Sequence, residues 1–136
     1  MRNMLQDTLF DIAESGHEPP DIVFIGNRER TYSLGYWSQF SKAINRDYDP
    51  NGYHTLASDL VIVFNDHSLL YRESDEDERA GWWEYLPGDT EEQAAEIPVE
   101  AAWSDDGATS LVNNYQKLIA AKAAEDTKKK LAALNK

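Results

Sequence analysis

The chain has 136 residues, 41% of them apolar, and contains no cysteine. This length predicts a protein with a core of its own, and the lack of cysteine excludes disulfides and thiol nucleophiles. The formal net charge is −12, and the whole excess lies between Asp66 and Asp106, where 14 acidic residues accompany two arginines. Such a charge disfavours direct binding to nucleic acid or to anionic membranes, because both require a basic face.

The first half of the chain contains two amphipathic helices and one strand. Apolar residues at helical spacing predict a helix over residues 3–15, ended by Gly16 and the prolines that follow. Residues 21–25 (DIVFI) predict a short strand. Trp37, Phe40 and Ile44 recur at +3 and +4, which predicts a second helix over residues 34–45, capped by Ser33 or Thr31.

Three strands follow in close succession. Residues 59–64 (DLVIVF) and 68–73 (SLLYRE) flank a tight turn and predict a hairpin, and residues 81–86 (GWWEYL) add a third strand. The DIVFI strand is expected to join this meander at an edge. On the third strand, Trp83 and Tyr85 should point to one side and Trp82, Glu84 and Leu86 to the other.

The last third of the chain is acidic and then rich in alanine and lysine. Trp103 is expected to dock residues 89–108 onto the body, and residues 110–135 predict a long helix. The fold class is therefore α+β: a three- or four-stranded, mainly antiparallel sheet packed by helices, with a long C-terminal helix. We expect residues 1–108 to form the core domain and residues 109–136 to form a helix partly packed on it.

One local motif could hold a cation. Asp47, Asp49 and Asn51 match the first half of a calcium-binding loop, in which side chains at alternate positions converge on the ion. The twelfth loop position is Ser58, where that loop requires a glutamate. The alternative is an Asx turn without metal, and it is the favoured one. His17, His54 and His67 have no spacing typical of zinc ligands and are expected on the surface.

The acidic segment and the tryptophan pair are the candidate interaction residues. Carboxylates massed on one face could imitate nucleic-acid phosphates and occupy a basic groove on a partner, or could simply keep the protein in solution. A tryptophan left exposed beside them would look like an interface hot spot. The candidate partner-binding residues are Asp75, Glu76, Asp77, Glu78, Trp82, Trp83, Glu91 and Glu92.

The central part of the chain also carries a resemblance. It rests on Ile25-Gly26-Asn27, Trp37 to Phe40, Tyr48-Asp49 with Gly52-Tyr53, Asp59 to Phe64, Leu69 to Arg72, and Gly81 to Tyr85. Over residues 21–87, this pattern resembles small uncharacterised proteins of tailed bacteriophages. The resemblance implies a phage or prophage protein that acts in a bacterial cytoplasm, and it implies no catalytic residue.

The sequence contains no nucleophile elbow, phosphate-binding loop, dinucleotide fingerprint or HExxH motif. We therefore expect a non-enzymatic acidic protein without a cofactor: a phage-encoded modulator or inhibitor of a host protein that presents a basic, nucleic-acid-binding surface. One alternative is a structural or assembly protein that oligomerises through its C-terminal helix. A further alternative is a calcium-binding module that uses Asp47, Asp49 and Asn51.

Overall fold

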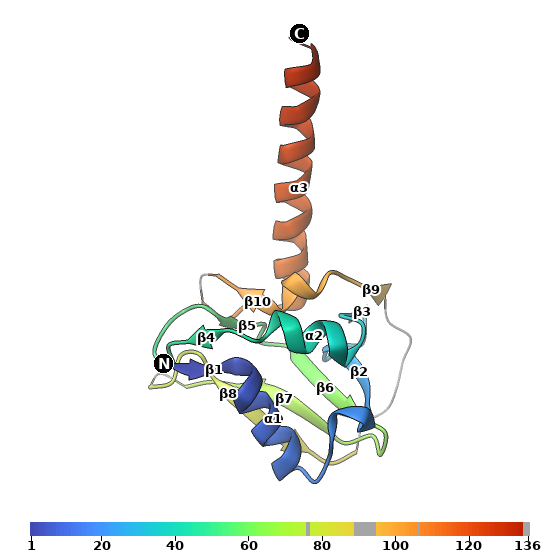
Figure 1. The fold of residues 1–136 in the computed structure, drawn as a ribbon, viewed down its shortest axis with the longest axis vertical. Coiled ribbons are helices and arrows are strands. Elements are labelled where there is room, and N and C mark those ends of the chain that lie inside the picture. Colours follow the sequence, from blue (N-terminus) through green and yellow to red (C-terminus); the bar gives the residue numbers. More distant parts are fainter. Residues whose placement is uncertain (76, 89–94, 106, 135–136) are drawn as a thin grey trace.

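Along the described chain, short strands alternate with three α-helices. The computed structural model describes residues 1–75, 77–88, 95–105 and 107–134 (Figure 1). The elements are β1 (Arg2–Asn3), α1 (Met4–Glu14), η1 (Pro19–Asp21), β2 (Ile22–Asn27), β3 (Tyr32–Ser33), α2 (Trp37–Ala43), β4 (Asp47–Tyr48), β5 (Thr55–Leu56), β6 (Leu60–Phe64), β7 (Leu69–Glu73), β8 (Trp82–Leu86), β9 (Ala95–Glu96), η2 (Val99–Ala102), β10 (Trp103–Ser104) and α3 (Leu111–Leu134).

The main sheet has six strands in the order β8-β7-β6-β2-β3-β9. Every neighbouring pair is antiparallel except β3 and β9, which run parallel. The α+β class and the predicted β6-β7-β8 meander are confirmed, but the expected three or four strands were too few. The additional strands, β3 and β9, have two residues each, which is too short for an apolar alternation to show. As expected, β2 joins the β6-β7-β8 meander at its edge by pairing with β6, and β3 then pairs with the other side of β2.

The first helix forms as its sequence pattern predicts. The Asn3 side chain caps it by accepting a hydrogen bond from the Gln6 backbone N–H at 3.0 Å. Met4, Thr8 and Ile12 recur every four residues and form the buried face. Gly16 follows with φ +83°, which closes the helix in the left-handed conformation that glycine favours.

The second helix is shorter than predicted. It begins at Trp37 after the N-cap Tyr36, so neither Ser33 nor Thr31 caps it. The preceding Leu34 is buried, but its backbone N–H donates to the Ile25 carbonyl and so extends the pairing of β3 with β2. The helical spacing of the apolar residues holds from Phe40 onward, and Phe40 and Ile44 are both fully buried.

The core lies between one face of the sheet and the helices. Figure 1 shows α1 and α2 lying in front of the strands β6, β7 and β8. The buried cluster on this side includes Met4, Phe40, Leu60, Ile62 and Trp83. Trp103 anchors the segment before α3 as predicted, because it is 7% exposed and its indole N–H donates to the Ala43 carbonyl at 2.9 Å.

The third helix projects from the body (Figure 1). Only its first turns are packed: Leu111 and Asn114 are buried, and Tyr115 and Leu118 pack partly against the core. The Asn114 side chain also donates to the Ala101 carbonyl at 2.8 Å. Every described residue from Ile119 onward is exposed. Within the described residues, no helix is both long and apolar enough to cross a membrane.

Candidate functional site

The face of the sheet opposite α1 and α2 is defined by the register of its strands. In the pairing of β7 with β8, Leu69 lies opposite Leu86, Tyr71 opposite Glu84, and Glu73 opposite Trp82. Because side chains alternate along a strand, all six residues point to the same side, away from the core that contains Trp83. We call this side the open face, since none of the three α-helices of the described chain packs on it.

The open face carries a small apolar cluster that is separate from the main core. Val61, Val63 and Leu69 are buried there, and the half-buried rings of Phe24 and Tyr71 pack against them. The guanidinium of Arg28 lies 4.7 Å from the centre of the Tyr71 ring. Beside this cluster runs a groove of about 420 Å³, lined by Arg28, Leu69, Tyr71, Glu73 and Leu86.

Trp82 is the tryptophan that the open face presents. Its side chain is half-buried, and its indole N–H donates to the Glu84 carboxylate at 2.7 Å. Glu73, directly opposite on β7, and Glu84 are both exposed. Trp82 therefore has two acidic neighbours on this face, and one of them accepts a hydrogen bond from the only polar atom of its ring.

The loop between β7 and β8 adds carboxylates at the same end of the sheet. Asp75 and Asp77 are exposed. The Asp75 side chain also accepts a hydrogen bond from the Glu78 backbone N–H at 2.7 Å, which fixes the loop. We call Glu73, Asp75, Asp77, Trp82 and Glu84 the acidic end of the open face. The predicted interaction residues Glu76, Glu91 and Glu92 lie outside the described residues.

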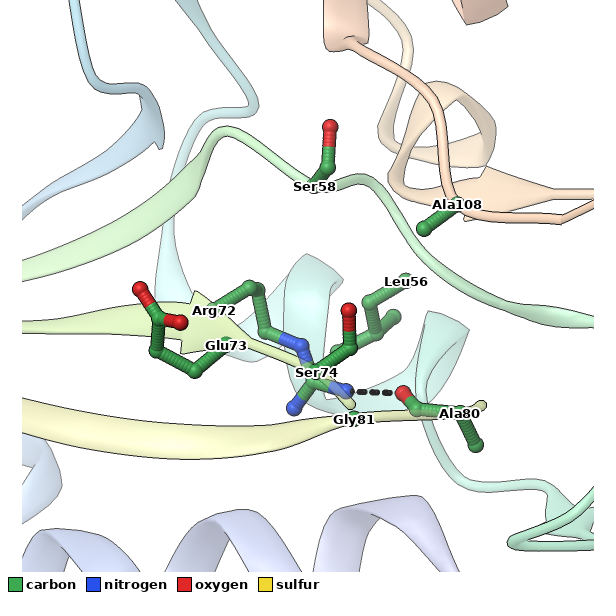
Figure 2. Close-up of a pocket in the computed structure, with 8 residues that line it drawn as sticks. All are labelled: Leu56, Ser58, Arg72, Glu73, Ser74, Ala80, Gly81 and Ala108. Carbon is green, nitrogen blue, oxygen red and sulfur yellow. Dashed lines mark hydrogen bonds between the residues drawn. The ribbon is translucent and has the colours of Figure 1, made fainter. Parts of the chain in front are cut away.

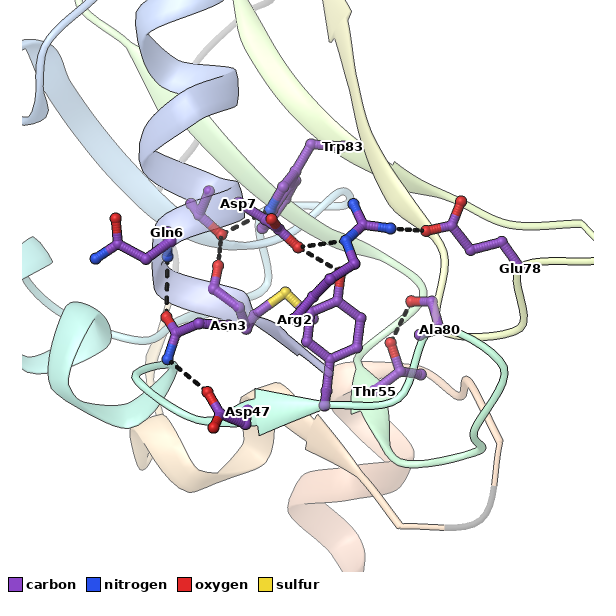
Figure 3. Close-up of polar contacts among 12 residues, drawn as sticks. Arg2, Asn3, Gln6, Asp7, Asp47, Thr55, Glu78, Ala80 and Trp83 are labelled. Carbon is purple, nitrogen blue, oxygen red and sulfur yellow. Dashed lines mark hydrogen bonds and ion pairs between the residues drawn. The ribbon is translucent and has the colours of Figure 1, made fainter.

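Glu78 belongs to a separate network near the N-terminus (Figure 3). Its carboxylate pairs with the Arg2 guanidinium at 2.6 Å, and the same guanidinium lies 3.2 Å from the Asp7 carboxylate. Asp7 also accepts the hydroxyl hydrogen bond of Tyr48, and burial together with that bond raises the Tyr48 pKa. Because Arg2 offsets its charge, Glu78 contributes less to an acidic surface than the sequence suggested.

Trp83 cannot take part in binding a partner, because it is part of the core. It is 5% exposed, and its indole N–H donates to the Thr8 hydroxyl at 2.9 Å. The sequence established that the two adjacent tryptophans point to opposite sides, but not which side the helices cover. The candidate anchor is therefore Trp82 alone.

Arg72 lies beneath the hairpin, on the same side as Trp83. Its guanidinium is 4.9 Å from the Trp83 ring and donates to the Ala80 carbonyl at 2.6 Å (Figure 2). Burial lowers the Arg72 pKa to about 10, although nearby acidic groups act in the opposite direction. A small cavity of about 120 Å³ opens beside it, lined by Leu56, Ser58, Glu73, Ser74, Ala80, Gly81 and Ala108. The guanidinium thus supports the base of the acidic loop from inside.

The predicted cation-binding residues form an Asx turn. Asp49 accepts a hydrogen bond from the Asn51 backbone N–H at 3.0 Å, and Asp47 accepts one from the Asn3 side chain at 3.2 Å. Asp47 also belongs to strand β4, which pairs with β1. Two of the three proposed ligands are therefore engaged with the chain itself. No group of three or more potential metal-ligating His, Cys, Asp or Glu side chains occurs among the residues that the structure describes.

His17 is not a surface residue, in contrast to the sequence prediction. Its side chain is 9% exposed and stacks on Phe64 at 4.0 Å between ring centres. Its ring nitrogens lie 3.0 Å from the Ser15 hydroxyl and 2.8 Å from the Asp66 carboxylate. This contact joins the end of α1 to the turn between β6 and β7. Because these segments lie about 50 residues apart in the sequence, no local pattern could predict the contact.

The Ser15-His17-Asp66 arrangement has the residue types of a nucleophilic triad, but its surroundings do not suit one. The Ser15 hydroxyl donates to the Ile12 carbonyl at 2.7 Å. The backbone N–H groups of Gly16 and His17 donate to helix carbonyls, so neither is available to stabilise an oxyanion. We therefore interpret the arrangement as a structural contact.

Comparison of the chain with models of protein families, with curated proteins and with solved structures finds no match. The open face and its charges are therefore the features from which a function can be inferred.

Proposed function

We propose that the chain is a non-enzymatic binding protein whose acidic end of the open face docks onto a basic surface of a partner protein. One observation carries this proposal: half-buried Trp82 has the exposed residues Glu73 and Glu84 as neighbours on a sheet face that no helix of the described chain covers. Tryptophan is among the residues that most often supply binding energy at protein interfaces.

The chemistry of the acidic end favours an arginine-rich partner. A guanidinium can stack on an indole face while it donates to a neighbouring carboxylate, and Trp82 and Glu84 are held together in that arrangement. Asp75 and Asp77 extend the negative charge beyond the edge of the strands. Charges of this kind mainly accelerate encounter and select the partner, whereas the buried aromatic ring slows dissociation.

The positive charge of Arg28 bounds the acidic end on its β2 side. Arg28 follows β2 and lies at the same end of the sheet as Glu73: its backbone N–H donates to the Asp59 carbonyl at 2.8 Å, and it lines the groove together with Glu73. A basic partner surface would therefore be attracted to the β7–β8 part of the open face rather than to its β2 side. The resemblance to phage proteins suggests that the partner is a bacterial host protein whose basic surface otherwise holds nucleic acid.

The experiment has two stages. The immobilised chain is first used to capture proteins from bacterial lysate at low salt, and the captured protein is identified by mass spectrometry. The dissociation constant of the purified pair is then measured for the wild type and for Trp82→Ala. Truncation of the anchor should weaken binding at least about tenfold, and higher salt should weaken the wild-type complex.

The matched control is Phe10→Ala, which removes another ring, 64% exposed, on helix α1 on the other side of the sheet. It should leave the dissociation constant unchanged. Glu73→Gln with Glu84→Gln should reduce the dependence of affinity on salt. A complex that binds equally well at low and high salt, or that tolerates Trp82→Ala, would rule out the proposed surface.

A further inference from the structure

The distal part of α3 carries an apolar stripe that the body does not use. Ala120, Ala124, Thr127, Leu131 and Leu134 follow one another at spacings of four and three residues, as in the seam of a coiled coil. All five are exposed, Leu131 at 55% and Leu134 at 80%. The Thr127 hydroxyl donates to the Ala123 carbonyl at 2.9 Å, so that its methyl group is the part left for packing.

This stripe lies on the opposite side of α3 from the residues that anchor the helix. Leu111 and Leu118 face the body. From Leu118 to Thr127 the helix makes about two and a half turns, which places Thr127 on the far side. The charged side chains Glu125 and Lys129, whose ion pair measures 3.5 Å, lie away from the stripe. Because the stripe points away from the body, the protein's own core cannot cover it.

Charge is strongly divided between the body and the helix. Residues 1–110 contain 23 acidic and seven basic residues, whereas residues 111–136 contain six lysines and only two acidic residues. A groove of about 290 Å³ beside the root of α3 is lined by Glu100 and Asp105 but also by Arg46 and Lys117, so the root itself is not acidic. The electrostatic complementarity lies between the acidic body as a whole and the lysine-rich end of the helix, with Lys128, Lys129 and Lys130.

We propose that α3 pairs with the α3 of a second copy of this chain, in antiparallel orientation, through the stripe from Ala120 to Leu134. A two-fold axis near Thr127 brings the two Thr127 side chains together and places Ala120 of each copy against Leu134 of the other. The antiparallel orientation places the lysines of each helix toward the acidic body of the other copy. A parallel pair would instead bring the two acidic bodies side by side.

The size of the stripe sets the expected strength of the pair. It spans two heptads and contributes only two leucines from each copy. Such an interface is at the small end of specific contacts, so the pair forms reversibly and depends on protein concentration. This inference does not rest on the proposed function, because α3 contributes no residue to the open face.

The association is tested by analytical ultracentrifugation of the full chain over a wide range of concentration. The wild type should pass from monomer to dimer, and Leu131→Glu, which places a charge in the stripe, should raise the dissociation constant at least about tenfold. The matched control is Ala133→Glu, which adds the same charge on another side of the helix. A wild type that stays monomeric throughout, or a control that weakens the dimer equally, overturns the proposal.

The orientation is tested separately by disulfide trapping, which the absence of native cysteine makes straightforward. In an antiparallel pair, Ala120→Cys and Leu134→Cys mixed together should form a mixed disulfide under mild oxidation. Leu134→Cys alone should form little disulfide, because the two positions 134 lie at opposite ends of the pair. Efficient disulfide formation by Leu134→Cys alone indicates a parallel pair and overturns the antiparallel arrangement.

Discussion

Asp11 shows how burial changes the charge of a single side chain. It lies on α1 and lines a cavity with Glu14, Trp83 and Tyr85. Burial, followed by repulsion from Asp7, raises the Asp11 pKa to about 6 from its usual value of 3.8. Between these two values the folded chain holds a proton that the unfolded chain releases. The free energy of unfolding contributed by Asp11 therefore falls as the pH rises from about 4 to about 6.

Asp11→Asn removes the charge that burial disfavours. We expect this variant to be more stable than the wild type above pH 6, by on the order of 1 kcal/mol after allowance for solvent screening. Below pH 4 the two should be equally stable, because Asp11 is then protonated in both states. Urea unfolding at both pH values measures the difference. Glu29→Gln, at an exposed position between β2 and β3, is the control, and an equal gain there would point to general charge repulsion.

Mutation of the two adjacent tryptophans should reduce stability by very different amounts. Trp83 is 5% exposed, so Trp83→Ala should lower the free energy of unfolding by about 3–5 kcal/mol, through the cavity and the lost hydrogen bond to the Thr8 hydroxyl. Trp82→Ala should lower it by about 1 kcal/mol or less, because Trp82 is only half-buried on the open face. Chemical denaturation of both variants tests this. Equal losses would contradict the assignment of the two sheet faces.

The sequence predicted the alternation of these side chains but not their environments. The period of two along residues 82–86 places Trp82 and Trp83 on opposite sides whatever covers the sheet. Which side is covered depends on where α1 packs, and this is a contact between residues 75 positions apart, such as Thr8 and Trp83. Local sequence patterns therefore could not predict which of the two tryptophans lies on the open face.

At the scale of elements, the start of α3 depends on a distant strand connection. Ser110 caps the helix by accepting from the Asn113 backbone N–H at 3.1 Å. The Asp59 carboxylate, just before β6, accepts from the Leu111 backbone N–H at 2.7 Å. Burial raises the Asp59 pKa, although the hydrogen bond from Leu111 opposes that effect. Asp59 thus ties the root of the projecting helix to the central strand of the body.

Loss of this contact should weaken the join between helix and body. Asp59→Ala leaves a backbone N–H of the first turn unsatisfied and should lower the free energy of unfolding by about 1 kcal/mol. Asp59→Asn keeps an acceptor oxygen and should cost clearly less. Thermal unfolding of both variants measures the effect. If the asparagine variant is as unstable as the alanine variant, the charge rather than the hydrogen bond is what matters at this position.

Elements with a long periodic pattern were predicted well, and short ones were not. The helix over residues 4–14 and the strands over residues 60–64 and 82–86 differ from their predicted bounds by one residue at most at either end. The sheet was underestimated because β3 and β9 consist of two residues each. Such strands form when tertiary contacts bring their backbones together, and no propensity within two residues can signal them.

At the scale of the whole molecule, charge and packing divide the chain at the same place. Asn114 is the last buried residue of the described chain, and Tyr115 and Leu118 are the last to pack partly against the core. The lysine-rich part of α3 begins a few residues later. The sequence indicated both properties, since large apolar residues become sparse after Ile119 and lysines take their place. It could not indicate that the helix continues away from the body instead of folding across the acidic segment.

Because the distal helix touches no described part of the body, its removal should leave the body intact. A chain that ends at Lys122 keeps the anchoring residues Leu111, Asn114 and Leu118 and loses only residues that are exposed or undescribed. At a protein concentration where the full chain is monomeric, we expect the two chains to have the same denaturation midpoint by tryptophan fluorescence. The far-ultraviolet circular dichroism of the shorter chain should show less helix. A lower midpoint would mean that the distal helix stabilises the body through contacts that the extended arrangement does not contain.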